Sequence, residues 1–233
     1  AEYGHQLNLS LDTIDSIIRQ GKEMGTYMYI YTGGEPLVRK ADLIKICEMH
    51  PDCQFLSFTN GTLIDEAFCQ AMLEVKNFVP ALSLEGFEEA TDARRGAGTY
   101  QKVVKAMDLL RSKNLMFGVS CCYTSQNFES ITSEDYYDKM IALGALFVWY
   151  FHYMPVGNGA VSELLPNPGQ REEMYRRIRH FSCQFPADPD SILPFVRTLK
   201  HPAVPANGHG LIPGCLVSRS SRHENGNGPR IFF

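Results

Sequence analysis

Short apolar runs alternate with amphipathic segments along most of the chain. The runs are rich in β-branched and aromatic residues and end in glycine or polar residues, which predicts buried strands. They cover residues 27–32, 53–59, 78–84, 116–123 and 146–153. Segments with apolar residues at helical spacing lie between them, at 10–24, 40–49, 64–75, 99–113 and 133–143, and a last helix runs from Pro168 to about residue 181. Ser10 and Thr99 are expected to cap two of these helices.

Five strands separated by helices predict an α/β fold with parallel strands and right-handed crossovers. An open doubly wound sheet and part of a (β/α) barrel both satisfy this pattern. In either architecture the loops that follow the strands gather at one edge of the sheet, where binding sites lie. Those loops read TGGEP, TNGT, SLEG and MPVGNG, so we expect the site at that edge.

Composition narrows the class of protein. The chain has 233 residues, a formal net charge of −4 and a sequence pI near 6.0, which argues against a general nucleic-acid binder. It contains no apolar run of membrane-spanning length and does not start like a signal peptide. The seven cysteines are dispersed and show no metal-ligand spacing, so we expect reduced, buried thiols. These features predict a cytoplasmic protein with no nucleic-acid or membrane partner.

The last part of the chain has a different character. Residues 183–233 contain seven of the 13 prolines and no sustained helical or strand period. We therefore expect a barrel-like domain over residues 1–182 and an irregular tail over 183–233. The tail reads either as a loop-rich, disordered extension or as sequence that is not native to the protein.

The string GGEP after the first predicted strand carries the strongest chemical signal. Gly33 and Gly34 let the backbone turn sharply and approach a ligand, and Pro36 fixes the chain beyond Glu35. A carboxylate held in this way suits a charge-assisted hydrogen bond from an ammonium group. A plain strand-to-helix turn would need only the glycine pair, so the full string favours a binding role.

In this position GGEP resembles the motif of the radical S-adenosylmethionine (SAM) enzymes, in which it follows the second strand of a partial (β/α) barrel and binds the amino group of SAM. Further strings agree in order: TNG at 59–61, SLEG at 83–86, DARRG followed by GTY at 92–100, and MPVG at 154–157. Thr91 stands where many members have histidine. The resemblance implies that SAM is bound by Gly33, Gly34, Glu35, Pro36, Thr59, Asn60, Ser83, Glu85, Arg95, Met154 and Val156.

The resemblance also implies distinct roles for these groups. The side chains of Ser83 and Glu85 would lie near the ribose and carboxylate of SAM, and Arg95 would be a partner of that carboxylate. Backbone groups around Met154 and Val156 would border the adenine. All of these would be binding groups rather than acid–base catalysts, because the hard chemistry belongs to the cofactor.

One family feature is missing from the sequence. Radical SAM enzymes hold a [4Fe-4S] cluster through CxxxCxxC after the first strand, and this chain has no such triplet. We expect the first strand and the cluster loop to lie upstream of Ala1, so that this chain alone is inactive. An intact relative would take an electron from a donor such as flavodoxin or ferredoxin, cleave SAM to a 5′-deoxyadenosyl radical, and abstract hydrogen from a substrate. The motif around Arg95 leans toward a peptide or protein substrate.

Other functions fit the residues less well. A Schiff-base aldolase needs a lysine at a strand end, whereas the lysines here fall on predicted helices or their starts. A nucleotide binder would use GxGxxG or GxxxxGK[ST], and neither occurs. A SAM-binding scaffold without a cluster and without radical catalysis stays open.

Overall fold

A parallel sheet organises the molecule. The computed structural model describes residues 8–157, 159–184 and 197–198. Its strands follow one another across the sheet in chain order, and every adjacent pair is parallel. They are β1 (Met28–Tyr31), β2 (Gln54–Thr59), β3 (Phe78–Ser83), β4 (Gly118–Tyr123), β5 (Val148–His152) and β6 (Arg197–Thr198).

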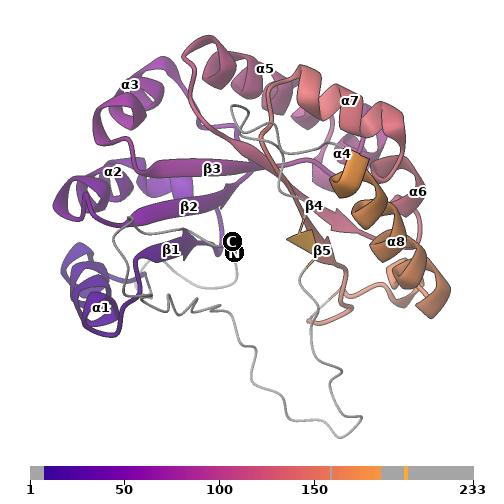
Figure 1. The fold of residues 1–233 in the computed structure, drawn as a ribbon, viewed down its shortest axis with the longest axis horizontal. Coiled ribbons are helices and arrows are strands. Elements are labelled where there is room, and N and C mark those ends of the chain that lie inside the picture. Colours follow the sequence, from indigo (N-terminus) through magenta and orange to yellow (C-terminus); the bar gives the residue numbers. More distant parts are fainter. Residues whose placement is uncertain (1–7, 158, 185–196, 199–233) are drawn as a thin grey trace, which may run out of the picture.

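The helices cover the outer side of this sheet, which curls into an open half barrel (Figure 1). They are α1 (Leu11–Glu23), α2 (Lys40–Met49), α3 (Glu66–Val75), α4 (Glu88–Arg95), α5 (Thr99–Ser112), α6 (Phe128–Ile131), α7 (Glu134–Ala142) and α8 (Pro168–Gln184). Two 3-10 turns, η2 (Pro36–Arg39) and η3 (Ser162–Leu164), lie in the loops after β1 and β5. Of the two predicted architectures, the structure therefore confirms the partial (β/α) barrel.

The two faces of the sheet differ in chemistry because side chains alternate along each strand. The convex face packs against the helices through buried apolar residues such as Phe55, Leu82 and Val119. The concave face carries Ser83 and Ser120, whose hydroxyl oxygens lie 3.2 Å apart. The apolar core therefore lies under the helices, and the concave side carries both polar groups and the aromatic side chains of Phe58 and Phe151.

The predicted helix starts are confirmed at one cap and wrong at another. Ser10 caps α1, because its hydroxyl accepts a hydrogen bond from the Thr13 N–H at 3.1 Å. Thr99, by contrast, is the first residue of α5, and Gly98 occupies the cap position with a φ of 76°. The carboxylate of Asp92 accepts the N–H groups of Gly98 and Tyr100 at 2.6 and 2.8 Å. Asp92 therefore caps the start of α5, which was the role predicted for the Thr99 hydroxyl.

Helix α4 and strand β6 fall outside the predicted pattern, as do the short helix α6 and the two 3-10 turns. Helix α4 has the sequence EEATDARR and buries only Thr91, so it shows no apolar repeat from which a helix could be read. Strand β6 pairs with β5 from within the predicted tail. The remainder of the 183–233 tail, beyond residues 183–184 and 197–198, lies outside the described residues, so the division into barrel and tail stays a prediction.

Candidate functional site

Glu35 connects the turn after β1 to the end of β2. Its Oε1 accepts hydrogen bonds from the N–H of Leu37 at 3.0 Å and from the hydroxyl of Thr59 at 2.6 Å. Its Oε2 accepts the N–H of Asn60 at 2.8 Å. The Thr59 hydroxyl in turn accepts the N–H of Gly61 at 3.1 Å. This network, which we call the Glu35 cluster, fixes the GGEP turn against the neighbouring strand.

The Glu35 carboxylate is thus largely used within the protein. A carboxylate has about four acceptor positions, and the described residues fill two on Oε1 and one on Oε2. Oε2 therefore keeps one position for a ligand. The glycines beside it leave the backbone open, because no atom lies within 4 Å of where a Cβ of Gly33 or Gly34 would be. Gly33 also has a φ of 124°, which side chains rarely tolerate.

Glu85, directly after β3, organises a second cluster. Its side chain is 1% exposed. Oε1 accepts hydrogen bonds from Nε of Arg95 at 2.9 Å and from Nη2 of the same residue, and Oε2 accepts the N–H of Cys122 at 2.9 Å. Nε of Arg94 lies 3.6 Å from Oε1. These contacts offset the desolvation of a buried carboxylate and join β3, α4 and β4 in the Glu85 cluster.

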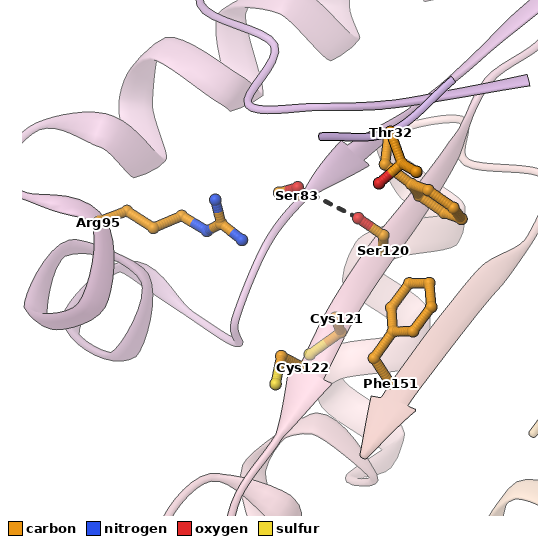
Figure 2. Close-up of a pocket in the computed structure, with 8 residues that line it drawn as sticks. Thr32, Ser83, Arg95, Ser120, Cys121, Cys122 and Phe151 are labelled. Atoms are coloured by element: carbon orange, nitrogen blue, oxygen red, sulfur yellow. Dashed lines mark hydrogen bonds between the residues drawn. The ribbon is translucent and has the colours of Figure 1, made fainter. Parts of the chain in front are cut away.

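A pocket of about 280 Å³ opens on the concave face beside the Glu85 cluster. It is lined by Thr32, Phe58, Ser83, Arg95, Ser120, Cys121, Cys122 and Phe151. In Figure 2 the guanidinium of Arg95 reaches toward the strands from α4, while the Ser83–Ser120 pair and the ring of Phe151 form the opposite wall. The pocket thus combines a cation, hydroxyls and aromatic rings.

The residues predicted to bind SAM fall into three groups. Ser83 and Arg95 line the pocket, with Glu85 behind Arg95. The GGEP turn, Thr59 and Asn60 form the Glu35 cluster. Met154 and Val156 lie after β5, with 51% and 72% of their surface exposed. The described pocket lining includes neither of these two.

His152, the last residue of β5, packs edge to face on the ring of Tyr123. Its Nδ1 lies 2.9 Å from the hydroxyl of Tyr123. Burial, followed by the nearby charge of Arg171, lowers the pKa of His152 below its usual 6.5. Both effects favour the neutral form of the imidazole.

Sequence reasoning missed several residues of the pocket. Phe58, Ser120 and Cys122 line it, and Arg94 stands beside the Cys122 thiol. Strand alternation was the available signal, because Ser120 and Cys122 must share one face of β4. The position of Arg94 depended on α4, which the sequence pattern did not reveal.

The described cysteines do not fit a [4Fe-4S] cluster. Cys47, Cys53, Cys69 and Cys121 are buried free thiols, and no three potential metal ligands come together within the described ranges. Burial raises the pKa of Cys47 to about 12 and that of Cys69 to about 11, which disfavours the thiolate that a metal requires. We therefore derive no chemical step through a cluster held by these residues.

Comparison with known proteins identifies the family. The family model of the radical SAM superfamily matches residues 1–135. The chain belongs to the radical SAM superfamily. SAM-dependent radical chemistry is the activity associated with this superfamily.

No helix in the described part of the chain is long and apolar enough to cross a bilayer.

The radical SAM relatives are longer than this chain. A serine-type anaerobic sulfatase-maturating enzyme of Klebsiella aerogenes is 30% identical over 141 residues, covering 55% of this chain and 34% of the relative. An AdoMet-dependent heme synthase of Methanosarcina barkeri is 26% identical over 177 residues, covering 74% and 48%. The chain therefore spans less than half the length of these two curated relatives.

Solved structures support the radical SAM fold. Streptococcus suis SuiB bound to S-adenosylmethionine superposes with a TM-score of 0.67 at 18% identity, covering 85% of this chain and 46% of SuiB. SuiB bound to the precursor peptide SuiA gives a TM-score of 0.62 at 19% identity, covering 76% and 40%. At this identity the likeness concerns the fold alone.

Proposed function

We propose that this chain binds SAM at the carboxyl edge of its half barrel and forms part of an enzyme that abstracts hydrogen from its substrate. The observation that carries the proposal is the Glu35 cluster, which holds an open glycine turn at the end of β1 beside a carboxylate with one unfilled acceptor position. An ammonium group is a suitable donor for that position and for the carbonyls of the turn.

The remaining site residues would bind the other parts of SAM. Glu85 occupies Nε and Nη2 of Arg95, which leaves Nη1 for the carboxylate of the methionine moiety. The Ser83 hydroxyl, already in the pocket wall, would meet the ribose. The backbone of residues 154–156 would border the adenine.

SAM held at this site would supply the chemistry, because its reduction by one electron yields methionine and a 5′-deoxyadenosyl radical. The protein's own contribution would be to hold SAM in one orientation and to keep water from the concave pocket. A [4Fe-4S] cluster and an electron donor such as flavodoxin or ferredoxin belong to the proposed enzyme, and the ligands of the cluster would have to lie outside the described residues.

We infer further that the substrate is a peptide or a protein. Among the relatives are sulfatase-maturating enzymes, and SuiB has been solved with a precursor peptide. The heme synthase relative shows that other substrates occur on similar chains, so a modified peptide must be demonstrated directly by mass spectrometry.

Titration of SAM into the chain by calorimetry tests the binding site. Glu35→Gln replaces an acceptor oxygen with a donor amide, so we expect SAM affinity to fall about tenfold, or about 1.4 kcal/mol. Glu74→Gln, at an exposed position on α3, is the matched control and should bind like the wild type.

The outcomes separate the candidate functions. Failure of the wild-type chain to bind SAM, or an unchanged affinity in Glu35→Gln, would overturn the proposed site. SAM binding with no release of 5′-deoxyadenosine from the full-length, cluster-loaded protein under reducing conditions would favour the non-catalytic scaffold instead.

A further inference from the structure

The two adjacent arginines of α4 share a single carboxylate. Arg94 and Arg95 both form ion pairs with Glu85. Asp92, the other acid near this end of the helix, is bonded to the N–H groups of Gly98 and Tyr100. The Glu85 cluster itself therefore holds two cations and one anion, an excess of one positive charge, and a partly desolvated charge without a close partner is unfavourable.

Of the two arginines, Arg94 is the one whose guanidinium donors are largely unused. Its Nε lies 3.6 Å from Oε1 of Glu85, beyond hydrogen-bond distance, because Arg95 already occupies that oxygen. The other oxygen of Glu85 accepts the N–H of Cys122. Apart from the weakly accepting Cys122 thiol, the described residues offer the Arg94 guanidinium no close hydrogen-bond acceptor.

The guanidinium of Arg94 has an aromatic neighbour. Its guanidinium stands 5.9 Å from the ring centre of Tyr153, a distance typical of a cation–π contact. The hydroxyl of Tyr153 accepts the N–H of Val161 at 3.0 Å, which holds the ring in place. The side chain of Arg94 is 37% exposed, so it is accessible at the end of β4 and β5 and partly shielded from water.

The pocket that Cys122 lines also has an aromatic wall. The rings of Phe58 and Phe151 meet edge to face at 5.0 Å, and both line the pocket together with Cys122. Trp149 stacks on Phe151 and also contacts Phe58. A ligand entering from Arg94 would thus pass the Cys122 thiol and reach an apolar surface.

We propose that Arg94 recognises a carboxylate on the substrate, and that an apolar group of the same substrate packs on Phe58 and Phe151. This rests on the proposed function, in which the methionine moiety of SAM lies at the Gly33–Glu35 turn and Arg95. The planar guanidinium can bind a carboxylate through two parallel hydrogen bonds, and the substrate's negative charge would balance the local excess. In a peptide substrate the acidic group would be an Asp or Glu side chain or the terminal carboxylate.

A matched pair of small probes tests Arg94 without knowledge of the natural substrate. The probes are 4-fluorophenylacetate and its neutral amide, and their binding to the chain is followed by fluorine NMR. We expect the wild type to bind the acid about tenfold more tightly than the amide, and Arg94→Gln to lose this difference. Arg94→Lys should retain part of this preference for the acid, because lysine keeps the positive charge but cannot form two parallel hydrogen bonds.

Two further measurements keep this result separate from the proposed SAM site. Arg19→Gln on the exposed side of α1 should leave the preference for the acid unchanged, and Arg94→Gln should bind SAM with wild-type affinity. A wild type that binds acid and amide equally, or does not bind the acid, overturns the proposal. An equal loss of SAM and acid binding in Arg94→Gln would assign this guanidinium to SAM instead. If the wild-type chain does not bind SAM but its preference for the acid probe over the amide depends on Arg94, the proposed SAM site is overturned and the carboxylate site at Arg94 stands.

Discussion

Two carboxylates at the strand ends serve the site chiefly by positioning other groups. Glu35 bonds to Thr59 and Asn60, and Glu85 bonds to Arg95 and Cys122. The sequence motifs predicted that Glu35 and Glu85 belong to the site, but they did not predict these hydrogen bonds. The hydrogen-bond partners lie 10 to 37 residues away from the two acids along the chain. The pairing of the strands and the position of α4 bring these partners within hydrogen-bond distance.

Neutralising Glu85 should therefore destabilise the whole protein. Glu85→Gln leaves Arg94 and Arg95 without a counter-ion, and we expect unfolding free energy to fall by about 2–3 kcal/mol, somewhat less than for a fully buried pair because both arginines are about a third exposed. Urea unfolding followed by circular dichroism measures this. The control Glu88→Gln, on the exposed side of the same helix, should change stability by less than about 0.5 kcal/mol. Equal stability of the two variants would show that the Glu85 cluster contributes nothing to folding.

Among the elements, those with apolar repeats were predictable and those without were not. The five strands and the helices between them lie within a few residues of their predicted ranges. Helix α4 escaped prediction because its partners are polar: Glu85 binds Arg95, and the Thr91 hydroxyl accepts the Glu85 N–H. An element held by such contacts leaves no hydrophobic period in its sequence.

Helix α3 offers a test of electrostatics at the scale of one element. Asp65 caps it by accepting the Phe68 N–H at 2.8 Å and forms an ion pair with Lys40. The hydrogen bond from Lys40, and then that from Phe68, hold the pKa of Asp65 below its ordinary value of 3.8. A carboxyl with a lowered pKa stabilises the fold above its ordinary value, and this contribution is lost as the pH falls through the folded pKa.

Asp65→Asn keeps the capping oxygen and removes the charge. At pH 6 we expect it to be less stable than the wild type by about 0.5–1 kcal/mol, since the pair is largely exposed. Urea unfolding at a series of pH values from 6 downward should show this gap starting to narrow near the ordinary pKa of 3.8 and continuing to narrow as the pH falls through the lowered folded pKa. Asp65→Ala, which also loses the cap, should be less stable by about a further 1 kcal/mol. A gap between wild type and Asp65→Asn that does not narrow as the pH is lowered below 3.8 would contradict the assignment.

Across the whole molecule, the two faces of the sheet should differ in thiol reactivity. Cys122 faces the pocket and is partly exposed, whereas its neighbour Cys121 is 1% exposed. Burial raises the pKa of Cys122, and the charge of Arg94 opposes this. Alkylation by iodoacetamide, mapped by tandem mass spectrometry, should therefore modify Cys122 before Cys121 and accelerate as the pH rises. Arg94→Gln should slow the modification of Cys122, and urea should abolish the difference between the two thiols. Equal rates in the folded protein would contradict the described burial.

The order of the strands has a consequence for biosynthesis. Each strand pairs with the next one along the chain, so each strand–strand interface is complete once the later of its two strands has left the ribosome. The Glu35 cluster needs the chain only as far as Gly61, whereas the Glu85 cluster must wait for Cys122. Translation from the amino end would therefore build the two halves of the binding edge one after the other.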